Sequence, residues 1–123
     1  MADVSKSMLK TVYDALDEKK GYEITVIDIH EISTIADYYV ITHGTSSSQV
    51  QALVDNVQEK MGKAGFHCSV EGMREARWVL MDYQDVVVNV FSRDDRSWFD
   101  LERIWRDGRF IKADEIAGYA EAE

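Results

Sequence analysis

The feature that most constrains the fold is a pair of strand-forming runs joined by almost no connecting chain. Residues Arg77–Tyr83 (RWVLMDY) and Asp85–Phe91 (DVVVNVF) are rich in apolar and β-branched side chains, which favour strands. Only Tyr83, Gln84 and Asp85 are left to reverse the chain between the two runs. So short a connection forces an antiparallel hairpin, and the hairpin predicts a β-sheet at the centre of the molecule.

Apolar periodicity predicts two helices in the first half of the chain. An apolar residue at every fourth position marks a first helix that ends at Gly21, and its stripe consists of Val4, Met8, Val12 and Leu16. Ser46 and Gln49 have the spacing of a capping box, which predicts the start of a second helix. That helix continues to about Lys63, and its apolar stripe consists of Val50, Leu53, Val54, Val57 and Met61.

Three further runs predict strands. Tyr22–Ile29 and Ala36–Thr42 are rich in β-forming residues and do not alternate cleanly with polar ones, so we expect both to be buried on two faces. Phe66–Val70 is a shorter strand before the hairpin.

After the hairpin, Asp94 or Asp95 is expected to cap a last helix that ends at Gly108, with one apolar face made of Trp98, Leu101 and Trp105. The predicted order is therefore α-β-β-α-β-β-β-α, an α/β (α+β) fold with a mixed sheet of about five strands flanked by helices. A chain of 123 residues supports one core. We expect a single domain over residues 1–111 and a frayed, acidic tail over residues 112–123.

The charge balance limits the class of partner. The formal net charge is −9, and nucleic acid is bound through clustered Lys and Arg. All seven arginines lie between Arg74 and Arg109, but that window also holds eight acids, so its balance is 7 − 8 = −1. We therefore expect little direct binding of nucleic acid, and a basic partner, of which ribosomal proteins are the commonest in a cytoplasm.

The expected compartment is the cytoplasm. Cys68 is the one cysteine, so no internal disulfide can form, and the first ten residues lack the apolar core of a secretory signal. No apolar run approaches the roughly 18 to 20 residues that cross a bilayer. We expect no membrane contact.

Few residue patterns suggest catalysis or metal binding. The turn His43–Ser48 could present backbone amides to a phosphate, but it lacks the lysine of a Walker loop and suits a plain helix cap better. The histidines show no metal-ligand spacing, and Cys68 and His67 would point to opposite faces of a strand. We expect no cofactor and no metal. Asp82 and Asp85 flank the hairpin turn and loosely resemble a magnesium-binding acidic pair, although acids are also ordinary turn residues.

The hairpin's first strand carries a candidate partner surface. Trp78, Leu80 and Asp82 share one face, and the other face consists of Val79, Met81 and Tyr83. Both faces are therefore largely apolar. If Trp78 and Leu80 are open, they form a patch of the kind reserved for partners, whereas periodicity alone favours the core for Trp78.

Three separated blocks resemble a known family. Ala36–Ile41 with Gly44–Val50, then Trp78–Val88, then Trp98–Trp105 resemble the Iojap family, the ribosomal silencing factor RsfS, in order and spacing. The resemblance extends from about Val4 to Trp105.

The resemblance implies a nucleotidyltransferase-like fold without transferase activity. It implies binding to ribosomal protein fourteen of the large subunit, which sterically blocks subunit association and represses translation under nutrient limitation. The family's interface positions correspond here to Trp78, Leu80, Asp82 and Asp85. Two positions depart from the family pattern: Asn89 replaces the usual His, and Gln84 replaces a turn Gly.

Two alternatives remain open at this point. The first is a magnesium-dependent nucleotidyltransferase that uses Asp82, Asp85 and the Gly44–Ser48 turn. The second is a dimeric scaffold, because apolar strand faces also suit a homodimer of the free chain.

Overall fold

The computed structural model describes residues 2–73 and 77–119 as one mixed α/β domain. Its helices are α1 (Ala2–Glu18), α2 (Ser47–Lys63), α3 (Arg93–Phe99), α4 (Leu101–Ile104) and α5 (Ala113–Ala117). Its strands are β1 (Tyr22–Asp28), β2 (Tyr38–Gly44), β3 (Ser69–Glu71), β4 (Trp78–Asp82), β5 (Val86–Ser92) and β6 (Arg109–Ile111). The predicted mixed sheet flanked by helices is confirmed, with six strands in place of about five.

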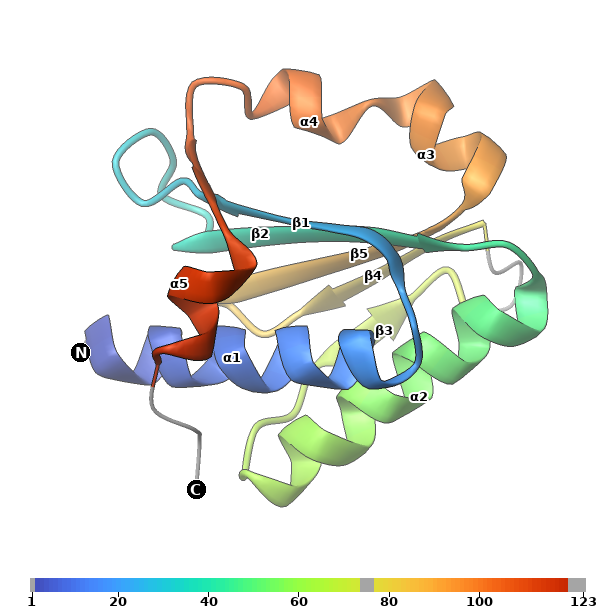
Figure 1. Cartoon of the computed structure of the whole chain (residues 1–123), viewed down its shortest axis with the longest axis horizontal. Coiled ribbons are helices and arrows are strands. Elements are labelled where there is room, and N and C mark those ends of the chain that lie inside the picture. Colours follow the sequence, from blue (N-terminus) through green and yellow to red (C-terminus); the bar gives the residue numbers. More distant parts are fainter. Residues whose placement is uncertain (1, 74–76, 120–123) are drawn as a thin grey trace.

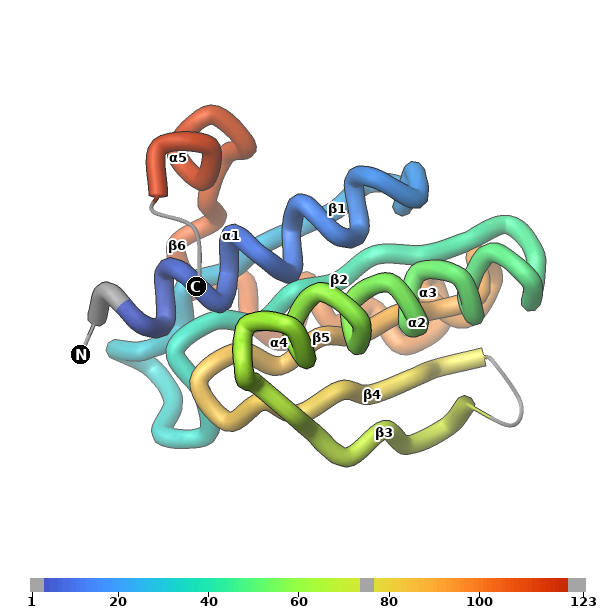
Figure 2. Tube along the Cα trace, turned by 90° about the horizontal axis from the view of Figure 1, so that it is seen from below, coloured from blue at the N-terminus to red at the C-terminus, as the bar shows by residue number. Residues whose placement is uncertain are grey.

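The sheet has the strand order β3-β4-β5-β2-β1-β6. The central pair β2 and β5 is parallel, while the other neighbouring strands are antiparallel, including the predicted β4–β5 hairpin. Helices α1 and α2 cover one face, and α3 and α4 lie on the other (Figure 1). Figure 2 shows α1 and α2 side by side, with β3 at one edge of the sheet and β6 beside α5 at the other.

The larger part of the core lies between the sheet and helices α1 and α2. Alternate residues of β4 and β5, among them Val79, Met81 and Val88, point to these helices and are fully buried. The strand β5 is buried on both faces, as is most of β2. The same prediction for β1 is wrong at its beginning, where Tyr22 and Glu23 are exposed, because the register with β2 is irregular between Tyr22 and Thr25.

The start of α2 agrees with its sequence signal. Ser46 caps the helix, and its hydroxyl accepts a hydrogen bond from the Gln49 amide at 3.1 Å. In a capping box the third helical residue bonds back to the cap residue itself. Here the Gln49 side chain accepts from the amide of Thr45, one residue earlier, at 2.8 Å.

The helix after β5 differs from the prediction. Ser92, not Asp94 or Asp95, caps α3, because its hydroxyl accepts from the Asp95 amide. At Asp100 the backbone adopts a left-handed conformation (φ 48°), which ends α3 and turns the chain into α4. The expected single apolar face is therefore divided.

The expectation that the chain frays from residue 112 is wrong for the described part. Residues 113–117 form α5, and Ile116 is buried against the α1–α2 side of the core. Arg109 of β6 holds this helix through a bidentate ion pair with Glu115, at 3.1 and 3.0 Å. The last residues, 120–123, lie outside the described part of the chain.

Candidate functional site: an open strip of the sheet face

Strand register places three of the four predicted site residues in one row of β4. Trp78 lies opposite Phe91 of β5, Leu80 opposite Asn89, and Asp82 opposite Val87. Helices α3 and α4 cover this face mainly over β5, β2 and β1, where Leu101 closes a second, smaller apolar cluster. The outer strand β4 is therefore left partly open, and both Trp78 and Leu80 are partly exposed.

The indole of Trp78 is held from three sides. It stacks on Phe91 with ring centroids 5.3 Å apart and contacts Phe99 of α3 at 4.6 Å. Its Nε1–H donates to Oδ1 of Asn89 at 3.0 Å. Trp78 thus belongs to the rim of the smaller core and also contributes to the surface.

Helix α3 carries two exposed aromatic side chains, one of which contacts Trp78. Trp98 is 81% exposed and Phe99, which contacts Trp78, is 39% exposed. The prediction that Trp98, Leu101 and Trp105 lie on one face of a single helix is wrong, because the break at Asp100 separates Trp98 from the other two. The apolar surface is consequently larger than the β4 residues alone would make it.

The acids Asp82 and Asp85 are both exposed and bracket the hairpin turn. Oδ1 of Asp82 accepts from the amide of Gln84 at 2.8 Å, and Gln84 has a positive φ of 72°. The left-handed backbone conformation favours glycine and is unfavourable for a side chain such as that of Gln84. The hydrogen bond from the Gln84 amide to Asp82 therefore helps hold Gln84 in this conformation. The backbone oxygen of Asp85 accepts from the amides of Asp37 and Tyr38, which ties the turn to the start of β2.

The arrangement does not form the nucleotidyltransferase site considered as an alternative. Asp85 bonds to Tyr38 at the start of β2, whereas Gly44 ends that strand and pairs with Ser92 at the far end of β5. A strand of this length separates the acids from the Gly44–Ser48 turn by roughly 20 Å. The amides of Thr45, within that turn, and of Gln49, directly after it, are also already bonded within the cap.

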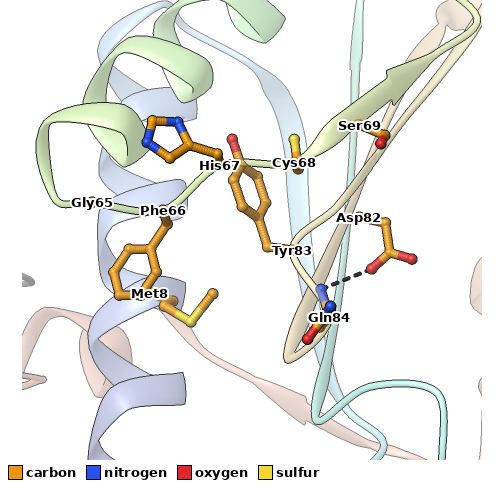
Figure 3. A pocket seen from close by; sticks show the side chains of 9 residues that line it. All are labelled: Met8, Gly65, Phe66, His67, Cys68, Ser69, Asp82, Tyr83 and Gln84. Carbon is orange, nitrogen blue, oxygen red and sulfur yellow. Dashed lines mark hydrogen bonds between the residues drawn. The ribbon is translucent and has the colours of Figure 1, made fainter.

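A hollow behind the turn is lined by Cys68 and His67, among other residues (Figure 3). Neither His67 nor Cys68 lies in β3, which begins at Ser69, and their side chains point in different directions. Burial raises the pKa of the Cys68 thiol, which disfavours the nucleophilic thiolate. Within residues 2–73 and 77–119, no group of His, Cys, Asp or Glu is arranged to hold a metal ion.

Asn89 is the polar residue at the centre of this face, and its role was not predicted from the sequence. It is fully buried, and besides accepting from Trp78 its Nδ2 donates to the backbone oxygen of Val40 at 3.2 Å. Burial raises the pKa of the nearby Tyr39 phenol, while hydrogen bonds with Asn89 and Trp105 oppose that rise. An amide within the apolar run DVVVNVF was the available signal, because a buried polar group needs partners.

Arg96 attaches α3 to the sheet and so sets how far the face is covered. Its buried guanidinium donates to the backbone oxygen of Tyr22, to Thr25, to His43 and twice to Glu102. Burial lowers the pKa of His43, and the Arg96 charge lowers it further. His43 is thus kept neutral, and its Nδ1 is an acceptor for Arg96.

The helices of the described chain include none that is long and apolar enough to cross a membrane.

Comparison with known proteins gives one consistent result. A Bacillus subtilis (strain 168) protein named ribosomal silencing factor RsfS is 42% identical over 110 residues, which cover 89% of this chain and 93% of that protein. A crystal structure from Chromobacterium violaceum has a TM-score of 0.79 at 33% identity, and covers 80% of this chain and 83% of that one. Another, from Bacillus halodurans, has a TM-score of 0.76 at 34% identity, and covers 85% and 95%. The family model described as "Ribosomal silencing factor during starvation" matches residues 2–123, and the chain belongs to this RsfS family.

Proposed function

We propose that this chain is a cytoplasmic ribosomal silencing factor that binds ribosomal protein fourteen of the large subunit. Bound there, it blocks association with the small subunit by its bulk and represses translation when nutrients are limiting. Family membership supports this role, since the family model is named for ribosome silencing during starvation.

The observation that carries the proposal is the partly open face of β4. A solvent-accessible Trp and Leu in a row, with the exposed Phe99 of α3 against the Trp, make the kind of aromatic and aliphatic patch that forms the centre of interfaces. Asp82 and Asp85 lie at the end of the same strip and are exposed. They would form an acidic rim that suits a basic ribosomal protein.

A steric mechanism needs no catalytic group. A footprint of about 800 Å² is standard for one side of a stable protein interface. The accessible surface of 7145 Å² offers such an area with most of the molecule left outside it. That remaining bulk is what would prevent the small subunit from joining.

Trp78→Ala tests the proposal. Loss of a central interface Trp weakens binding by about 2 kcal/mol or more, roughly thirty-fold. Truncation of a fully buried aromatic side chain lowers the free energy of unfolding by about 3 to 5 kcal/mol. Trp78 is partly exposed, so its truncation should lower that free energy by less, about 2 kcal/mol. The measurements are co-sedimentation with large subunits, inhibition of subunit joining, and thermal unfolding.

Phe110→Ala is the matched control, because Phe110 is a 47% exposed aromatic residue on the edge strand β6, at the other side of the sheet. It should leave binding unchanged. Wild-type binding by Trp78→Ala would refute the proposed site. If Trp78→Ala changed the oligomeric state of the free chain and nothing else, the result would favour the hypothesis of a dimeric scaffold.

A further inference from the structure

Asn89 occupies an unusual position for a polar side chain. It lies in the central strand β5, directly between Leu80 of β4 and Ile41 of β2, and has no exposed surface. An amide buried among apolar side chains destabilises the fold unless it is hydrogen-bonded. Its hydrogen bonds from the Trp78 indole and to the Val40 carbonyl connect a partly exposed indole to the backbone of the sheet.

The hydrogen bond between Trp78 and Asn89 fixes an orientation of the indole that the aromatic contacts of Trp78 do not fix. Contacts with Phe91 and Phe99 restrict the plane of the indole, but apolar contacts are not directional. Nε1–H is the one donor of a Trp side chain. Its bond to Oδ1 of Asn89 therefore determines which edge of the ring faces the sheet and which edge faces solvent.

We propose that Asn89 is a positioning residue that orients Trp78 for partner binding and so raises the affinity of the open face without touching the partner. This inference rests on the function proposed above. An indole already held in its bound orientation loses less entropy on binding than one that rotates freely.

A purely structural role for Asn89 is the rival explanation, and the chain offers a matched control. Asn56 of α2 is also buried, and its Nδ2 donates to the Ala15 carbonyl at 2.8 Å and to Glu18 at 2.9 Å. It lies between α1 and α2, on the opposite side of the sheet from Trp78. Loss of Asn56 should lower stability and leave the open face unchanged.

The experiment compares Asn89→Leu with Asn56→Leu in the full chain. Affinity for large subunits is measured by sedimentation, and stability by thermal unfolding. The indole N–H signals of the three tryptophans are observed by ¹⁵N NMR, with Trp78→Phe used to assign the Trp78 signal. Asn89→His tests rescue, because a neutral imidazole can also accept a hydrogen bond.

We expect Asn89→Leu to move the Trp78 indole signal, speed its exchange with solvent, and weaken binding about three- to ten-fold, the range of one neutral hydrogen bond. Asn56→Leu should change neither the Trp78 indole signal nor the affinity for large subunits. Asn89→His should partly restore the wild-type signal and the wild-type affinity. In a Trp78→Ala background, Asn89→Leu should have no further effect on binding, because its action passes through the indole.

Several results would overturn the inference. An unmoved indole signal in Asn89→Leu would show that Asn89 does not orient Trp78, whatever the binding result. Wild-type affinity of Asn89→Leu, when Trp78→Ala has lost binding, would refute positioning and leave the proposed docking face intact. Wild-type affinity of Trp78→Ala would instead refute the docking face. Should Asn89→Leu not fold, Trp78→Phe removes the same hydrogen bond from the other side, and its unchanged affinity would count against the inference.

Discussion

Replacing Arg96 by Met should loosen the attachment of α3 to the sheet. The guanidinium has all five of its N–H donors engaged, on partners in β1, β2 and α4. Its side chain is only 7% exposed, while that of Glu102 is 30% exposed. Met keeps an unbranched apolar stem and removes every donor.

The size of the stability loss depends on which partners of Arg96 can be hydrated once the guanidinium is removed. Breaking a fully buried ion pair costs about 3 to 5 kcal/mol, because one charge stays buried and unpaired. Glu102 is exposed enough to be rehydrated, whereas the buried His43 keeps an unpaired nitrogen. We therefore expect a loss of about 3 kcal/mol, which lowers the melting temperature of a domain this size by about 10 to 15 °C.

Thermal unfolding followed by circular dichroism measures the loss. Arg103→Met is the control, since Arg103 is an exposed residue of α4, and it should melt within about 1 °C of wild type, as surface changes usually do. Arg96→Lys should lie between the two, because an ammonium cannot reproduce the planar fork. A melting temperature of Arg96→Met within 2 °C of wild type would refute the reasoning.

Two further predictions concern charge. Asp82→Lys with Asp85→Lys should abolish large-subunit binding, with only a small loss of stability from the missing bond between Asp82 and the Gln84 amide. The equal charge change Asp14→Lys with Asp17→Lys on α1 should leave binding intact, and wild-type binding should weaken as salt rises. Unchanged inhibition of subunit joining by the first variant would place the interface elsewhere. The hydrogen bonds that the Arg109 guanidinium donates to Glu115 lower the pKa of the Glu115 carboxyl to about 2. A depressed carboxyl pKa stabilises the fold above the ordinary value of 4.5 and loses that contribution as pH falls toward 2. Glu115→Gln should therefore melt below wild type at pH 6 and together with it near pH 2, and a difference that persists at pH 2 would contradict this.

Local sequence signals determined much of the framework. The short turn between two strand-forming runs forces the β4–β5 hairpin, and the period-two alternation of β4 places Trp78 with Leu80 and Asp82 on one face. The cap at Ser46 predicted the start of α2 to the residue. These features depend on neighbours in the chain, so a single sequence contains them.

Only the tertiary structure decided which face of the hairpin is covered. Both faces of β4 are largely apolar, so alternation separates them without saying which one meets α1 and α2. That choice depends on contacts between distant segments, such as the bond from Arg96 to the Tyr22 carbonyl, 74 residues apart. The exposure of Trp98 likewise follows from a left-handed residue at Asp100, a conformation that periodicity does not reveal. Local propensities extend over a few residues, whereas the burial of a side chain is set by whichever part of the chain packs against it.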